Sequence, residues 1–210
     1  MMIMGNTNES GLKDVLTLLS VFLGIVGLLF GLFQYYKAQK WKKSEFAAGL
    51  LEQLSSSPDL ALCCIFLDWK ARRIAVPEKY KVFTEDTSFV HRWEDLTKAL
   101  SSDEEEANFV FPLVLYRDVF DQFFTYLDRI SHYINIGLFD VKDVQSLAYW
   151  LKQLKNSRYA VKDGTTGEII NPFFKFINAY DYQGTKNLLG MPEATKLSKK
   201  FDEVLSSAER

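Results

Sequence analysis

The sequence predicts an all-α protein in which one N-terminal transmembrane helix continues into a cytoplasmic helical bundle. Val15 to Tyr36 is an apolar stretch of 22 residues without a charged side chain. After it, apolar residues recur at helical spacing in several segments. Aromatic residues make up 15% of the chain, which favours a dense core over disorder. The remainder of about 170 residues is large enough for one compact domain.

The apolar stretch has the length and the flanks of a membrane-spanning helix. At about 1.5 Å per residue it is about 33 Å long, close to a hydrocarbon core of about 30 Å. It is too long for the apolar region of a signal peptide, and no small-x-small cleavage site follows it. Lysines follow the stretch, whereas the residues before it are near neutral. The positive-inside rule therefore predicts a bacterial inner-membrane protein with its N-terminus outside and its C-terminal domain in the cytoplasm.

The cytoplasmic end of this helix carries side chains that suit the headgroup region. Aromatic residues are enriched at that depth, and lysines attract anionic lipid at about 1 kcal/mol each. We expect membrane lipid to be contacted here by Tyr35, Tyr36, Lys37, Lys40, Trp41, Lys42 and Lys43.

Small residues form a stripe along one side of the apolar stretch. Together with Thr17, the residues Ser20, Gly24, Gly27 and Gly31 fall within an arc of about 80°. Small side chains let a second helix approach closely, and the last two glycines have the dimerisation spacing. Helix packing, with a second copy or a membrane partner, is one interpretation. The other is that glycine is simply common in membrane helices.

The chain after the stretch divides into predicted segments. The membrane helix is expected to run on to Leu54, and Ser57 with Pro58 to begin a second helix. Further helices are expected at 58–73, 87–100, about 105–136, 140–154 and 173–180, with a short extended piece at 80–83, and with Gly184, Gly190 and Pro192 as breaks. The domains are then 1–14 outside, 15–36 in the membrane, 37–57 juxtamembrane, 58–192 cytoplasmic bundle and 193–210 polar tail.

The longest soluble helix shows the clearest pattern. Apolar residues are spaced 4, 3, 4, 3 and 4, as in the seam of a helix bundle. Pro112 is expected to kink or divide this helix, and Gly137 to end it in the left-handed conformation. The acidic run Asp103 to Glu106 is expected to favour its N-terminus. The seam comprises Tyr116, Phe120, Phe123, Leu127, Ile130 and Ile134.

The composition excludes several classes of function. The net charge is −2, which is not the basic footprint of a nucleic-acid-binding protein. The two cysteines, Cys63 and Cys64, are adjacent, so a normal bridge between them is disfavoured, and we expect them to be reduced and buried. No histidine, cysteine and carboxylate cluster has zinc-ligand spacing, and no phosphate-binding glycine loop occurs. The sequence therefore predicts no catalytic residue, no metal, no cofactor and no small-molecule substrate.

One polar line is the only candidate for acid–base chemistry. Arg117, Asp121, Asp128 and His132 lie along one side of the predicted 113–136 helix. The alternative is an exposed polar face opposite the apolar seam. Burial around a shared pocket would favour an enzyme, and exposure would favour the polar face.

Several segments in order resemble a known group of proteins. They are Trp41 to Phe46, Leu67 to Ile74, Tyr116 to Phe124 and Tyr149 to Leu151. Their order is similar to that in DUF4760-like proteins, which are uncharacterised bacterial proteins with one transmembrane helix and a helical cytoplasmic domain. The resemblance covers about residues 41–154. It implies a bacterial origin and the same architecture, and it brings no catalytic residues.

Three functions remain open at this point. The first is a membrane-anchored interaction module, a scaffold or regulator that binds a protein partner or forms a homo-oligomer through its anchor. The second is an effector or sensor of a bacterial stress or phage-defence system. The third is an enzyme that uses the polar line of the 113–136 helix.

Overall fold

The computed structural model describes residues 7–101, 110–162 and 169–191, and the chain divides into two compact units between Phe46 and Ala47. Helices dominate the described chain, and the strands form two short antiparallel pairs. The all-α prediction is therefore confirmed. Each unit is described by itself below.

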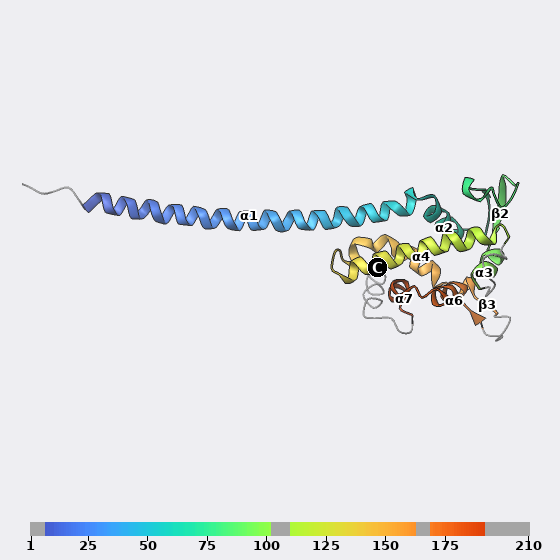
Figure 1. Cartoon of the computed structure of the whole chain (residues 1–210). Helices are drawn as coiled ribbons and strands as arrows, with labels where there is room; N and C mark the ends of the chain where they lie inside the picture. Colours follow the sequence, from blue (N-terminus) through green and yellow to red (C-terminus); the bar gives the residue numbers. More distant parts are fainter. Residues whose placement is uncertain (1–6, 102–109, 163–168, 192–210) are drawn as a thin grey trace, which may run out of the picture. The chain divides into compact units, whose positions relative to one another are not determined.

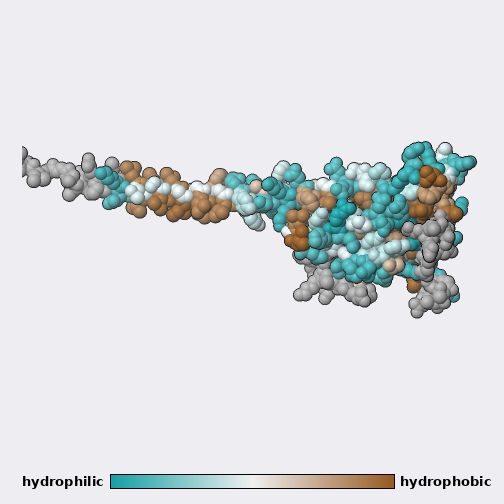
Figure 2. Space-filling view, viewed as in Figure 1, coloured by the Kyte–Doolittle hydropathy of each residue, from teal (hydrophilic) through white to brown (hydrophobic). Residues whose placement is uncertain are grey.

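The first unit consists of the larger part of helix α1, which spans Thr7–Ser56 (Figure 1). An 18-residue window of this helix has a mean hydropathy of 2.6, and none of the window is buried. Figure 2 shows its apolar surface as a brown band. Apolar surface in water costs about 25 cal/mol per Å². This helix is long and apolar enough to span a membrane.

The second unit begins with the last turns of α1. Ala47 and Leu50 are buried, and the Tyr126 hydroxyl donates a hydrogen bond to the Leu50 carbonyl oxygen at 2.9 Å. The unit therefore starts before position 58, where the sequence places the bundle. The helix has no break between Tyr36 and Leu54, as predicted, and α2 (Pro58–Asp68) starts at the expected proline.

A hairpin follows α2, and both of its strands overlap segments that the sequence predicts as helix. Strand β1 (Ala71–Ala75) pairs antiparallel with β2 (Ser88–Arg92), and the 3-10 helix η1 (Glu78–Tyr80) lies between them. Helix α3 (Trp93–Ser101) comes next. The predicted helix up to residue 73, the extended piece at 80–83 and the helix start at 87 are therefore wrong. Pairing with a distant strand satisfies the backbone groups that local propensity assigns to helix.

Helix α4 (Leu113–Asn135) forms the centre of the second unit. All six seam residues predicted from the spacing are buried. The peptide bond between Phe111 and Pro112 is cis, and the helix begins directly after it. The expected break at Pro112 is therefore confirmed, whereas an uninterrupted helix from residue 105 is wrong. The acidic run at 103–106 lies outside the described residues. Gly137 follows the helix with a φ of 72°, as predicted.

The segment after α4 differs from the single helix that the sequence predicts for residues 140–154. Asp140 and Asp143 form a capping box at the expected start, but the first turns are the 3-10 helix η3 (Val141–Leu147), followed by α5 (Ala148–Leu154). After η4 (Ser157–Tyr159), strands β3 (Val161–Lys162) and β4 (Ile169–Ile170) pair. The chain then forms α6 (Pro172–Ala179) and α7 (Gln183–Leu189). The predicted tail at 193–210 lies outside the described residues.

Aromatic packing joins the last helices to α4. Phe120 of α4 lies 5.2 Å from Phe173 of α6 between ring centroids, and Phe124 lies 5.9 Å from Phe176. These are distances at which aromatic pairs attract beyond simple burial. Gly184, which the sequence treats as a break, lies inside α7, and Gly190 ends that helix with a φ of 65°. Residues 172–191 therefore contribute to the core.

Candidate functional site

The small-residue stripe on α1 has open space in front of it. A Cβ added at Gly24, Gly27 or Gly31 would meet no atom within 4 Å in the described chain. Ser20 donates a hydrogen bond to the Thr17 carbonyl oxygen at 2.8 Å, so its hydroxyl is satisfied within the helix. Among the described residues, no side chain therefore approaches these three glycines, so this face of α1 is open there.

The predicted headgroup residues are exposed on the same helix. Tyr35, Tyr36 and Trp41 have exposed fractions of 65%, 71% and 67%. The lysines at 37, 40, 42 and 43 are exposed as well. A shallow groove along the helix is lined by Lys37, Lys40 and Trp41 together with Gln34, Ala38 and Ser44. All seven predicted headgroup residues therefore lie on the exposed surface of α1.

The four residues of the polar line lie on one helix but do not form one site. From Arg117 to His132 the helix rises by about 22 Å, at 1.5 Å per residue. Arg117 is buried and donates hydrogen bonds to the Ala99 carbonyl oxygen at 3.0 Å and to the Tyr180 hydroxyl. His132, at the other end, is exposed. A single small substrate cannot contact both ends of this line.

Two carboxylates of the polar line, Asp121 and Asp128, bind the segment that contains α7. Asp121 accepts a hydrogen bond from the Tyr182 hydroxyl. Asp128 accepts hydrogen bonds from the backbone N–H of Thr185 at 2.6 Å and from its hydroxyl at 2.7 Å. Gly184 lies so close to Asp128 that an added Cβ would be 2.7 Å from the Asp128 Cα. These contacts give the polar line a structural role in attaching α7 to α4.

Asp121 also lines a hollow in the second unit. It has a volume of about 320 Å³ and lies between the end of α1, α2 and α4. None of the other three residues of the polar line contributes to it. The lining comprises Gln53, Ser57, Leu60, Asp121, Gln122, Thr125, Tyr126 and Arg129.

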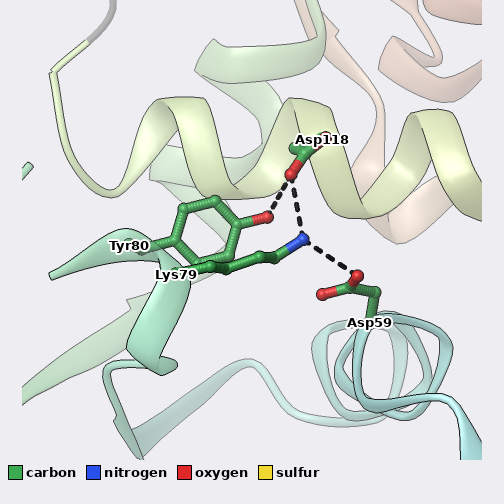
Figure 3. A network of polar contacts seen from close by, with 4 residues as sticks. All are labelled: Asp59, Lys79, Tyr80 and Asp118. Carbon is green, nitrogen blue, oxygen red and sulfur yellow. Dashed lines mark hydrogen bonds and ion pairs between the residues drawn. The ribbon is translucent and has the colours of Figure 1, made fainter. Parts of the chain in front are cut away.

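A charged network that the sequence does not indicate connects three elements (Figure 3). Lys79 of η1 lies 2.9 Å from an Asp59 carboxylate oxygen on α2 and 3.1 Å from one of Asp118 on α4. The Tyr80 hydroxyl donates to the same Asp118 oxygen. The contacts join residues 20 and 39 positions apart, so no local spacing reveals them.

Contacts within this network favour the charged forms of Asp118 and Lys79. Burial raises the pKa of the Asp118 carboxyl, but hydrogen bonds from Tyr80 and Lys79 lower it by more, so the net direction is downward. Burial also opposes the charge of Lys79, but its interactions with Tyr80, Asp59 and Asp118 raise its pKa above the usual value. Both groups are therefore charged near neutral pH, as an ion pair that holds the elements together requires.

His91 is buried in β2 with both ring nitrogens bonded. Nε2 lies 2.9 Å from the Trp69 carbonyl oxygen, which can only accept, so Nε2 carries the proton. Nδ1, 2.9 Å from the Tyr116 hydroxyl, then accepts its hydrogen bond. Burial lowers the pKa of His91, against the opposing effect of its hydrogen bonds and of Asp95 and Glu94. A neutral ring that donates and accepts at once fits a structural role at the base of the hairpin.

The adjacent cysteines are both free thiols in α2. Cys63 is buried and Cys64 is partly buried. Burial raises the pKa of both, and nearby Asp68 contributes to raising that of Cys64 to about 12. Because the thiolate is the reactive form, this environment disfavours nucleophilic or metal-binding chemistry. Among the described residues, no three histidine, cysteine or carboxylate side chains are grouped to hold a metal ion.

The comparisons with known proteins do not extend this picture. No protein-family model, no curated protein and no solved structure matches the chain.

Proposed function

We propose that the chain is a single-pass membrane protein whose helical domain is a cytoplasmic interaction module, a scaffold or regulator. The observation that supports this best is the apolar window of α1, with a mean hydropathy of 2.6 and none of it buried. The second unit has an extensive core of its own. The resemblance to DUF4760-like proteins points to the same architecture. A bilayer would cover the apolar surface and leave the folded unit in water.

The orientation follows from the charges beside the apolar stretch. Lys37, Lys40, Lys42 and Lys43 follow it, and the positive-inside rule assigns that side to the cytoplasm. Fusion of a fluorescent protein or of alkaline phosphatase to the C-terminus in a bacterial host tests this. We expect fluorescence and no phosphatase activity. Phosphatase activity without fluorescence would refute the orientation.

Self-association through the stripe is part of the proposal. Ser20, Gly24, Gly27 and Gly31 leave a face on which a second α1 can approach closely, and van der Waals packing drives such contacts in lipid. Energy transfer between labelled full-length chains in vesicles measures it. Changing all three glycines to leucine should weaken association at least tenfold. Leu18→Phe with Leu29→Phe, on the opposite side, is the control and should change nothing. Equal transfer in all three proteins would show that the stripe only faces lipid.

The proposal assigns no catalysis to the polar line. Arg117, Asp121 and Asp128 bind groups of the same unit, and His132 is exposed about 22 Å from the other end of the line. Their geometry supports the attachment of α6 and α7 to α4. An interaction module needs such a rigid scaffold, because a rigid surface loses less entropy on binding.

A further inference from the structure

Basic side chains gather on the hairpin of β1 and β2. Lys70, Arg72, Arg73 and Arg92 are all exposed. Arg72 lies over the Trp69 ring at 4.9 Å, and Arg73 donates to the Ser88 hydroxyl at 3.3 Å. Within the described part of the chain, none of these four cations forms an ion pair. Their charges are therefore exposed and not neutralised by a direct ionic contact with a described residue.

The same hairpin presents an unpaired strand edge. The Trp93 N–H donates to the Lys70 carbonyl oxygen at 3.2 Å, and the Val76 N–H donates to that of Thr87 at 2.9 Å. These two bonds identify the pairs of Lys70 and Val76 as hydrogen-bonded pairs. Hydrogen-bonded and non-hydrogen-bonded pairs alternate along an antiparallel ladder, so Ala71, Arg73 and Ala75 belong to non-hydrogen-bonded pairs.

The outward groups of these three residues are available to a ligand. Their backbone N–H and C=O point away from β2, and the sheet has two strands only, so β1 is an edge. The side chains of Ala71, Arg73 and Ala75 are exposed. No described residue hydrogen-bonds to these outward groups. Figure 2 shows hydrophilic surface beside an apolar patch in the region that Figure 1 labels β2.

We propose that the β1 edge binds an extended acidic segment of a partner protein by strand addition. The segment's backbone would pair with the outward groups of Ala71, Arg73 and Ala75. Its carboxylates would pair with Arg72, Arg73 and Arg92, whose guanidinium groups suit carboxylates in two-point contacts. The inference rests on the proposed role as an interaction module and names the surface and the chemistry of the partner.

The charge and the edge together select this occupant. A second copy of the hairpin would bring like charges edge to edge, which opposes pairing. A phospholipid headgroup or a nucleic acid would supply anions but would leave the backbone edge unpaired. Only an acidic polypeptide satisfies both features.

The charge component is tested with the full chain in nanodiscs of zwitterionic lipid. The probe is a labelled eight-residue peptide in which pairs of glutamates alternate with pairs of valines, so that carboxylates lie on both faces of the strand, and binding is followed by fluorescence anisotropy. We expect saturable binding that weakens as salt screens the charges. The variant Arg72→Glu, Arg73→Glu, Arg92→Glu should bind at least tenfold more weakly. The matched reversal Lys98→Glu, Arg129→Glu, Lys142→Glu, at exposed cations elsewhere in the unit, should bind as the parent does.

The strand component has its own test. A peptide of the same sequence, N-methylated at every residue, keeps its charge but cannot donate backbone hydrogen bonds along either edge. It should bind at least tenfold more weakly. Ala75→Pro, which removes one outward N–H, should also weaken binding, whereas Ala75→Ser should not. Because the methylated peptide leaves the protein unchanged, it decides the question even if the proline variant fails to fold.

Three outcomes would overturn the inference. They are equal binding of the two peptides, no loss on reversing the three arginines, and tighter binding of an oligonucleotide or of phosphatidylglycerol vesicles than of the peptide. None of them affects the topology and energy-transfer experiments, which use no peptide. Failure of the strand-addition site is therefore distinguishable from failure of the proposed function.

Discussion

Helices α1 and α4 are both long and rich in apolar residues, yet their surroundings are opposite. From Val15 to Tyr36 every residue of α1 is exposed, whereas α4 buries residues along most of its length. Apolar residues occur all round the exposed stretch, but in α4 they follow the seam spacing, with polar residues between them. A helix with one apolar face can be covered by protein, while a helix that is apolar all round needs an apolar surrounding on every side.

The largest expected effect comes from making the same change in both helices. Phe120→Ala in α4 should lower the free energy of unfolding by about 3–5 kcal/mol, because it leaves a cavity among buried rings. Phe22→Ala in α1 should leave it unchanged. Urea unfolding of the full chain in nanodiscs, followed by tryptophan fluorescence, measures both. A comparable loss in Phe22→Ala would mean that the exposed stretch contributes to the folded core.

Glycine gives a second, smaller contrast between the two regions. Gly184→Ala should destabilise by about 1–3 kcal/mol, since its Cβ would meet the Asp128 backbone at 2.7 Å. Gly24→Ala, with no atom within 4 Å, should not destabilise the domain. Thermal unfolding of the two variants gives the comparison. If Gly184→Ala were stabilising, as helix propensity alone predicts, the close approach of α7 to α4 would be wrong.

Acid should weaken the buried unit through His91. Its pKa is lowered in the folded protein, so below the unfolded value of about 6.5 the unfolded chain binds the proton first. The contribution is fully present above that pH and is lost as pH falls toward the folded pKa, by about 1.4 kcal/mol per pKa unit. Unfolding midpoints between pH 8 and 5 measure this, with His91→Gln as the reference. Parallel pH profiles for both proteins would contradict the assignment.

The smallest effect is expected at the charged network. Lys79→Met removes two partly exposed ion pairs and should cost about 0.2–1 kcal/mol for each. High salt should reduce the difference from the parent protein. Lys81→Met, which removes an exposed pair with Glu78 in the same segment, is the control and should be close to neutral. If Lys79→Met lowers the free energy of unfolding no more than Lys81→Met does, the contacts of Lys79 drawn in Figure 3 do not contribute measurably to stability.

The sequence correctly predicts the helices that have clear apolar spacing or clear capping residues of their own. The α4 seam, the uninterrupted α1 and the starts at Pro58 and Asp140 follow from spacing and capping residues that act locally. The hairpin is missed because the strand at 71–75 consists of alanine, arginine and one isoleucine. Alanine and arginine favour helix, and only pairing with a strand 13 to 21 residues further along the chain overrides that preference.

The candidate polar site shows the same limit. Spacing correctly places Arg117, Asp121 and Asp128 on α4, but their partners Tyr180, Tyr182 and Thr185 lie 57 to 63 residues away. A local pattern therefore identifies polar side chains on a helix without identifying what satisfies them. The network of Lys79 and the outward edge of β1 also depend on tertiary contacts, and no sequence signal reveals them.

The buried end of α1 determines where the second unit can be separated from the apolar part of that helix. A soluble fragment starting at Pro58 would lose Ala47 and Leu50 from the core, and the Tyr126 hydroxyl would lose its acceptor. An unsatisfied buried hydroxyl alone costs about 1–3 kcal/mol. Proteolytic release after Lys43, by contrast, would cut an exposed segment and leave the core complete. The practical boundary for crystallisation or calorimetry is therefore inside the long helix.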